Sequence, residues 1–242
     1  MNVLVIGDEH TCRCGLPAGQ LSYIGHFIRQ ISRTERSVSV EAYAHLTLPT
    51  VSAVLKRLPL NRYDLIILQL DYTSVQTASS AGKQTLRYGG VLMLPHLYQP
   101  LRPKNQNASE RKTRLATLRE AIRKFGVVSL IRPRRIATAI DALLEQLRPY
   151  RHNVMLLTPF PHREPVENWL RKRSRDLLMH KADNQLISVF DVNSVVASRE
   201  EYFLTNSDEH LNAVSHELIG RALFDFYQSA PTIVTIQTIR RE

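Results

Sequence analysis

The amino-acid sequence predicts a doubly wound α/β protein, with three layers (α/β/α) around a mainly parallel sheet of five strands. Two observations carry this prediction. Short apolar segments, rich in β-branched residues, alternate with longer segments of helical periodicity, and each apolar segment is only four to eight residues long. Segments that are apolar at nearly every position are typical of strands buried on both faces, as in a parallel sheet covered by helices.

The expected strands follow this pattern in chain order, and they comprise residues 2–6, 37–42, 64–70, 152–158 and 186–192. The first of them is expected at the centre of the sheet. Between and after them, apolar residues recur at helical spacing. These expected helices comprise residues 19–32, 50–58, 111–125, 134–147, 166–180 and 212–227. Pro133 and Pro165 stand where a helix can begin, because the first turn needs no proline N–H.

The chain is expected to form one domain over residues 1–230, followed by a C-terminal extension over residues 231–242. Within the extension, residues 232–239 (TIVTIQTI) alternate polar side chains with Val and Ile, which indicates a half-buried strand. Such a strand could add to a sheet edge in this chain or in a second copy, so a homodimer formed through this strand is a second expectation.

Composition indicates an ordinary globular protein, with 43% hydrophobic and 22% charged residues among 242. The sequence has no apolar run of about 18 residues, so no membrane span is expected. The two cysteines, Cys12 and Cys14, are too close together to staple a fold, and they suit a reducing compartment. A cytoplasmic protein without a metal or another cofactor is therefore expected.

The net charge of +10 is concentrated in residues 102–135, where eleven Lys and Arg residues stand against two Glu. Such a segment could attract an acidic partner. It lacks the interleaved aromatic residues on which bases stack, which argues against nucleic-acid binding. The simplest interpretation is a solvated loop and helix face.

The triplet Asp-Glu-His occurs twice, at residues 8–10 and at residues 208–210. The first copy follows the first expected strand, and the second precedes the last expected helix. In open α/β sheets, ligands bind beyond the carboxyl ends of the strands, and both copies are expected to lie at that edge. The two triplets are therefore expected to face one cleft.

Five stretches of the sequence resemble the SGNH hydrolases, the superfamily of GDSL-type lipases and esterases. They are VLVIGDEHT (3–11), YDLIILQLD (63–71), NVMLLTPFP (153–161), ISVFDV (187–192) and SDEHLNAVSHELIGRAL (207–223). The resemblance covers almost the whole chain, and its most specific part is the HLN segment that opens the last helix. It implies the SGNH-hydrolase fold.

The resemblance also implies site residues. Glu9 stands where the family has its nucleophilic serine, and His210 matches the family's histidine base. The residue three before that histidine, a carboxylate in the family, is Ser207 here, while Asp208 lies two before it. Glu9, Asp208 and His210 are the candidate catalytic residues.

The oxyanion hole of the family has no clear counterpart. Asp71 and Thr73 stand where the family has a glycine and a donor asparagine, and residues 42–47 contain no glycine where the family has another. Together with Asp8 and His10, Asp71 and Thr73 are candidate ligand-binding residues. Because a glutamate has no hydroxyl to deliver and places negative charge near a developing oxyanion, serine-ester chemistry is not expected.

The sequence therefore predicts an SGNH-hydrolase-like protein that is impaired in catalysis and binds a small molecule, such as an acyl or carbohydrate ligand. One alternative is an active hydrolase on ester or acyl bonds that uses His210 with Glu9 or another nucleophile. Another alternative is a basic scaffold for acidic partners. Glu9 and His210 are expected to pair within hydrogen-bond or one-water distance, which is favoured over a metal site made from the two triplets.

Overall fold

The computed structural model describes residues 1–8, 10, 11, 15–34, 37–44, 48–69, 133–205 and 207–230, without the side chains of residues 49 and 133–136. The expected helix at 111–125, the side chains of the basic stretch 102–135 and the extension 231–242 lie outside the described residues. The expectations attached to them, including the edge strand and the homodimer, remain predictions.

The sheet has five strands, and every pair of neighbours is parallel. Its order is β2-β1-β3-β4-β5, and the strands are β1 (Asn2–Gly7), β2 (Ser39–Ala44), β3 (Leu65–Gln69), β4 (Val154–Leu157) and β5 (Ser188–Phe190). This arrangement confirms the predicted fold class and the placement of the third and fourth strands in one sheet. Strand β1 was expected to be the central strand, and that expectation is wrong. It is an interior strand, but β3 is in the middle because only β2 lies beyond β1.

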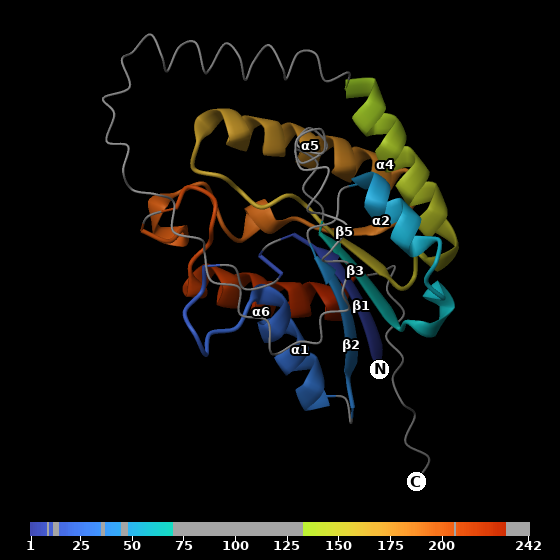
Figure 1. Ribbon diagram of the computed structural model, residues 1–242, viewed down its shortest axis with the longest axis horizontal. Coiled ribbons are helices and arrows are strands. Elements are labelled where there is room, and N and C mark those ends of the chain that lie inside the picture. Colours follow the sequence, from blue (N-terminus) through green and yellow to red (C-terminus); the bar gives the residue numbers. More distant parts are fainter. Residues whose placement is uncertain are drawn as a thin grey trace.

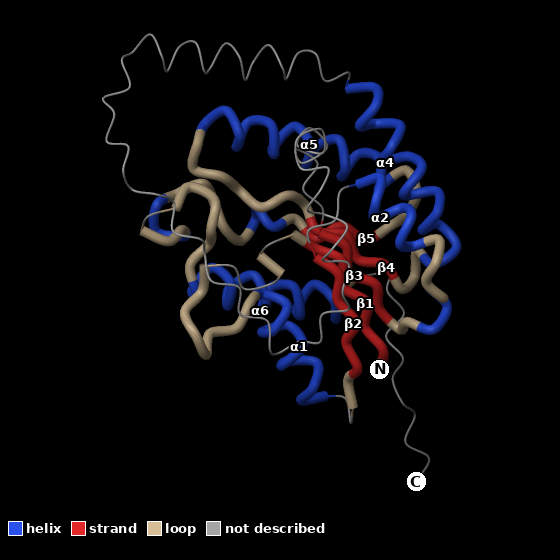
Figure 2. Tube along the Cα trace, viewed as in Figure 1, coloured by secondary structure: helices blue, strands red, loops and turns tan. Residues whose placement is uncertain are grey.

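Helices cover both faces of the sheet, which gives three layers (Figures 1 and 2). Helices α1 (Tyr23–Thr34) and α6 (Ala213–Ser229) lie on one face. Helices α2 (Leu48–Leu55), α4 (Pro133–Leu147) and α5 (Pro165–Asp183) lie on the other. Among the described residues, no helix is long and apolar enough to cross a membrane.

The alternation of side chains along β1 divides the core in two. Val3 and Val5 pack toward α1 and α6, whereas Leu4 and Ile6 pack toward α2, α4 and α5. All four side chains are at most 1% exposed. A strand whose successive side chains are buried on opposite faces has to be apolar throughout, which is why this segment carries no polar residue between Val3 and Ile6.

Helix α1 begins at Tyr23, four residues later than the sequence pattern indicated. Gly19 adopts a positive φ of 86°, and the Gln20 N–H bonds to the Pro17 carbonyl, so this segment is a turn. Ser22 then caps the helix, because its hydroxyl accepts the N–H of Gly25 at 3.3 Å. The apolar periodicity continued across the turn, and only the cap marks the true start.

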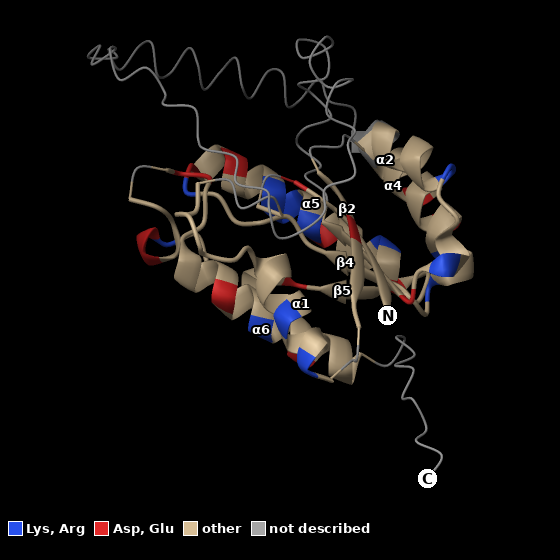
Figure 3. Cartoon of the chain, turned by 60° about the horizontal axis from the view of Figure 1, so that its bottom comes forward, with Lys and Arg blue, Asp and Glu red and all other residues tan. Residues whose placement is uncertain are grey.

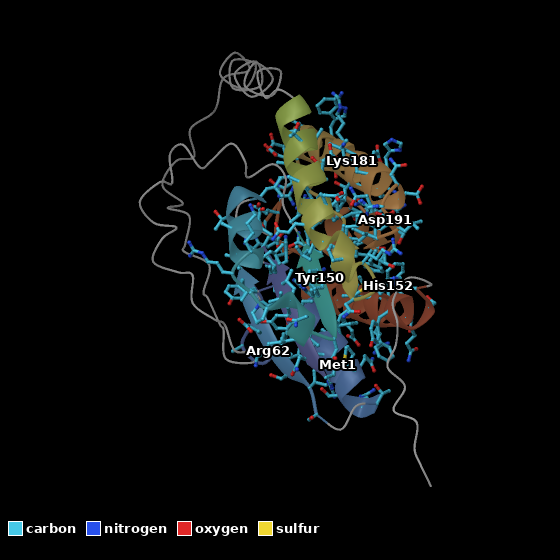
Figure 4. The ribbon with its side chains drawn as sticks, turned by 90° about the vertical axis from the view of Figure 1, so that its right-hand side faces the viewer. Met1, Arg62, Tyr150, His152, Lys181 and Asp191 are labelled. Carbon is cyan, nitrogen blue, oxygen red and sulfur yellow. The ribbon has the colours of Figure 1, made fainter. Side chains whose placement is uncertain are left out.

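Close contacts join the helices within each layer. At Gly220 of α6, a Cβ atom would lie 2.7 Å from the Tyr23 carbonyl oxygen and 2.5 Å from the His26 Cβ, so glycine lets α6 approach α1 closely. On the opposite face, Lys181 of α5 bonds to Asp141 of α4 at 2.5 Å, and Figure 4 shows Lys181 on this side of the molecule. These contacts hold neighbouring helices together within each layer.

Candidate functional site at the carboxyl edge of the sheet

The chain leaves β1 in a tight turn that is fixed by Asp8 and Gln69. The Asp8 N–H donates to Gln69 Oε1, and Gln69 Nε2 donates to the Asp8 carboxylate, both at 2.9 Å. Asp8 also accepts the N–H of His10 at 2.9 Å. Asp8 therefore caps the turn by accepting a backbone hydrogen bond, and Gln69 anchors it from the last residue of β3.

Gly7 is the point where the turn folds back on the strand. A Cβ atom at Gly7 would lie 1.9 Å from the Thr11 hydroxyl oxygen. Thr11 is 1% exposed, and its hydroxyl is hydrogen-bonded to the Tyr23 hydroxyl at 2.9 Å. Glycine is required here because a larger residue would displace this buried pair.

His10 projects into the protein. Its ring is 1% exposed and lies 4.6 Å from the Phe160 ring, centroid to centroid. Neither ring nitrogen has a hydrogen-bond partner among the described residues. Burial holds the pKa of His10 well below its usual range, and the nearby His216 and Arg171 add to this effect. His10 is therefore neutral at physiological pH.

The second triplet lies in a short turn between Phe203 and Leu211, which form an isolated antiparallel bridge. The Leu204 N–H bonds to the His210 carbonyl at 2.9 Å, and the Ser207 N–H bonds to the Leu204 carbonyl at 3.0 Å. Asn212 then caps α6 by accepting the N–H of Ser215 at 2.9 Å. The HLN segment thus joins a closed turn directly to a helix.

The two acidic residues of this second triplet point to two different arginines. Asp208 Oδ1 lies 3.6 Å from Nε of Arg163. Glu209 Oε1 lies 3.3 Å from Nη2 of Arg171, whose side chain is 8% exposed and whose other terminal nitrogen donates to the Phe160 carbonyl. Arg171 belongs to the group of basic residues along α5 (Figure 3). Glu209, which sequence reasoning did not single out, is therefore the acidic residue that ties the His210 turn to the core.

His210 itself contacts Ser207, because the Ser207 hydroxyl oxygen lies 2.9 Å from Nδ1 of the imidazole. In the resembling family a carboxylate stands at position 207, and here a hydroxyl takes its place. Asp208 was expected to be a catalytic residue. In the structure its side chain forms an ion pair with Arg163.

The histidines of the two triplets lie close together at one edge of the sheet, while the expectation that both triplets face one cleft remains a prediction. The ring centroids of His10 and His210 are 6.1 Å apart, and those of His10 and His216 are 6.0 Å apart. In Figure 1, the end of β1 and the segment before α6 lie on the same side of the sheet. Residues at opposite ends of the sequence therefore form one cluster.

His216 is the buried end of this cluster. It is fully buried in α6, and its Nδ1 accepts the N–H of Tyr23 at 3.1 Å, which joins α6 to the start of α1. Burial lowers the pKa of His216 to about 3.

Sequence reasoning missed Gln69, Phe160, Arg171 and Tyr23 as parts of this cluster. The signal available for Gln69 was a polar residue at the end of an otherwise apolar strand, a place where a side chain must find a partner if it is buried. Arg171 sits in the basic run of α5 and looks like a surface residue in sequence. The contact between Phe160 and His10 depends on the tertiary fold, and no local sequence pattern indicates it.

Several expected site residues lie outside the described part of the chain, namely Glu9, Asp71 and Thr73, as do Cys12 and Cys14. The distance between Glu9 and His210 therefore remains a prediction. Within the described ranges, no three His, Cys, Asp or Glu side chains are grouped as a metal ion would require.

The strand order and the helix layers define a three-layer α/β protein built on a parallel sheet. No protein-family model and no curated protein sequence matches the chain, whereas solved structures do. A lipase from a goat-rumen metagenome superposes with a TM-score of 0.56 at 15% identity, covering 96% of this chain and 98% of its own.

Two further solved structures agree with this result. An acetylxylan esterase from Geobacillus stearothermophilus has a TM-score of 0.57 at 13% identity, over 97% of this chain and 96% of its own. A lipolytic protein of the G-D-S-L family from Desulfitobacterium hafniense has a TM-score of 0.55 at 13% identity, over 93% and 98%. At these identities the likeness establishes the fold, which is the one that the sequence motifs predicted.

Proposed function

We propose that this protein binds a small molecule at the carboxyl edge of an SGNH-hydrolase fold and does not hydrolyse esters by serine chemistry. The observation that carries the proposal is the identity of residue 9. The turn after β1 is held by Asp8 and Gln69, and the residue after Asp8 is a glutamate where the resembling family has its serine.

The physical cost of this replacement is large. In serine hydrolases of the subtilisin type, loss of the nucleophile lowers turnover about 10^6-fold. A glutamate at the same place adds negative charge where an oxyanion would form, and each missing oxyanion donor costs about another 10^2–10^3-fold. Asp71 and Thr73 stand where the resembling family has a glycine and an asparagine that donates to the oxyanion. The loss of the nucleophile and the loss of oxyanion donors would therefore multiply.

The described hydroxyls near this edge do not replace the missing nucleophile. Thr11 is buried and bonded to Tyr23. Thr158 is also buried, and it donates to Asp191 and accepts the N–H of Val192. Ser207 accepts two backbone N–H groups and contacts His210. Each of these three hydroxyls takes part in a hydrogen bond that stabilises the fold.

For the ligand, we propose an acylated carbohydrate or a related acyl compound. One feature supports this class: structurally similar proteins include acetylxylan esterases. A fold that once aligned an acyl group beside a histidine can retain the binding geometry after its chemistry is lost.

Calorimetric titration with acetylated and with deacetylated xylo-oligosaccharides tests the ligand class. We expect saturable binding of the acetylated compound, which weakens about tenfold or more in His210→Ala and is unchanged in the matched surface variant His152→Ala. An absence of binding to both compounds at millimolar concentration would overturn the proposed ligand class.

A further inference from the structure

The Ser207 hydroxyl makes three contacts within the turn that contains His210. Its oxygen lies 2.9 Å from the backbone nitrogen of His210, 3.3 Å from the backbone nitrogen of Glu209 and 2.9 Å from Nδ1 of the His210 ring. The first two contacts have a fixed direction, because a backbone N–H can only donate.

The direction of the third contact follows from counting. A serine hydroxyl has two lone pairs and one hydrogen. The N–H groups of Glu209 and His210 occupy both lone pairs, so the remaining hydrogen is the one that can bond to Nδ1. Ser207 therefore donates, and Nδ1 accepts.

From this arrangement we propose that Ser207 is a positioning residue that holds neutral His210 in the tautomer protonated on Nε2. A neutral imidazole carries one proton, and an Nδ1 that accepts a hydrogen bond cannot carry it. His210 is then a hydrogen-bond donor at Nε2 rather than a base. This holds whether or not the ligand class proposed above is right.

A carboxylate at position 207 would impose the opposite tautomer. It can only accept, so it selects an Nδ1–H and leaves Nε2 unprotonated, which is the form that takes a proton from a serine. In chymotrypsin-type proteases, exchange of the orienting carboxylate for an amide keeps the geometry but lowers turnover about 10^4-fold through the wrong tautomer. The Ser207 hydroxyl produces the same inversion here by different chemistry.

The ligand chemistry that follows rests on the proposed function. An Nε2–H recognises an oxygen acceptor, such as the carbonyl of an acyl group. The site would then hold an acyl ligand by the atom that an active hydrolase uses to remove a proton. Binding without turnover is the expected consequence.

Nitrogen-15 NMR of the imidazole rings tests the tautomer in the ligand-free protein. At about pH 8, where an ordinary histidine is neutral, we expect the unprotonated resonance of His210 to belong to Nδ1. The signals of His210 are identified by their loss in His210→Gln. In Ser207→Asp the proton should move to Nδ1, and in Ser207→Ala the preference for Nε2 should weaken.

Ser194→Ala is the matched control, because the Ser194 hydroxyl also donates to an acceptor in a short turn, the Asp191 carbonyl, but does not contact His210. It should leave the His210 signals unchanged. Should Ser207→Asp fail to fold, the wild-type spectrum decides. A wild-type His210 protonated on Nδ1, or a folded Ser207→Ala with the full wild-type preference, overturns the proposal. Either result leaves the ligand titrations, and hence the proposed function, untouched.

Discussion

The two Asp-Glu-His triplets have the same sequence and opposite environments. In the first, Asp8 is fixed by Gln69, and His10 is 1% exposed with no hydrogen-bond partner for its ring among the described residues. In the second, Asp208 pairs with Arg163, and His210 is partly exposed and bonded to Ser207. At the end of a buried strand, the histidine of the triplet becomes part of the core. In the turn before α6, the side chains of the same triplet are partly or fully exposed.

The difference explains why a repeated tripeptide is no evidence for a repeated function. His10 lies between Phe160 and two other histidines because β1 and α6 converge there. His210 is placed by hydrogen bonds within its own turn. The first histidine is defined by tertiary packing, and the second by local geometry.

The largest expected effect that separates the two regions is acid instability from the buried histidines. The folded-state pKa values of His10 and His216 lie below their ordinary values, so only the unfolded chain takes up protons as the pH falls below about 6.5. Stability is therefore fully present above pH 6.5 and is lost below it. By pH 5 the burial of His216 should cost about 2 kcal/mol of unfolding free energy, and His10 acts in the same direction.

Urea denaturation between pH 8 and pH 5 measures this loss. The variant His10→Phe should remove the contribution of one histidine, and His152→Ala, on the exposed surface, should leave the pH dependence as it is. Residual pH dependence is expected from His26 and His162, whose pKa values are also lowered by burial. A His10→Phe protein with the full wild-type loss would show that His10 is not buried and neutral.

A second test concerns the turn of the first triplet. Gly7→Ala should destabilise the protein by about 3 kcal/mol, because the new Cβ meets the buried Thr11 hydroxyl. The double variant Gly7→Ala/Thr11→Ala should recover part of this loss, since the closest contact is gone. Gly25→Ala, whose Cβ would lie 3.1 Å from the Leu21 Cβ rather than 1.9 Å from a buried hydroxyl, is the control and should lower the unfolding free energy by less than Gly7→Ala does.

A third test asks whether His10 has a structural role alone. His10→Phe should stabilise the protein at pH 8 by about 1–2 kcal/mol, because it removes two buried nitrogens without partners and keeps the contact with Phe160. The same substitution at His210 should give no such gain. Thermal denaturation compares the two variants, and a destabilised His10→Phe would indicate that the His10 ring makes a hydrogen bond with a group outside the described residues.

The smallest expected effects separate the two acidic residues of the second triplet. Glu209→Gln should cost about 1–2 kcal/mol, because it removes the charge that Glu209 places 3.3 Å from the buried Arg171 side chain. Asp208→Asn should cost less than about 0.5 kcal/mol, because the Asp208 side chain is 66% exposed and its pair with Arg163 is screened by solvent. Equal costs in chemical denaturation would contradict the assignment of Glu209 as the anchoring residue.

Much of the fold could be predicted because it follows from local sequence patterns, such as apolar segments and helix caps. Strands β1, β3 and β4 are buried and apolar at nearly every position, and the HLN segment contains the helix cap Asn212. The start of α1 could not be predicted, because it depends on the cap at Ser22. The middle position of β3 could not be predicted either, because it depends on which strands pair. At the site, the convergence of His10 and His210 followed from topology alone. The Ser207 contact did not, because its direction depends on two backbone N–H groups that no sequence pattern reports.

The most direct test of the account is hydrolysis of p-nitrophenyl acetate by wild type, His210→Ala, Glu9→Ser and Glu9→Ser/Ser207→Asp. We expect wild type and His210→Ala to show the same background rate, and Glu9→Ser to gain little, because its histidine keeps the proton on Nε2. Only the double variant restores both the hydroxyl and the orienting carboxylate, so it should gain most, limited by Asp71 and Thr73. Wild-type turnover well above background that disappears in His210→Ala would contradict the account and establish an active hydrolase.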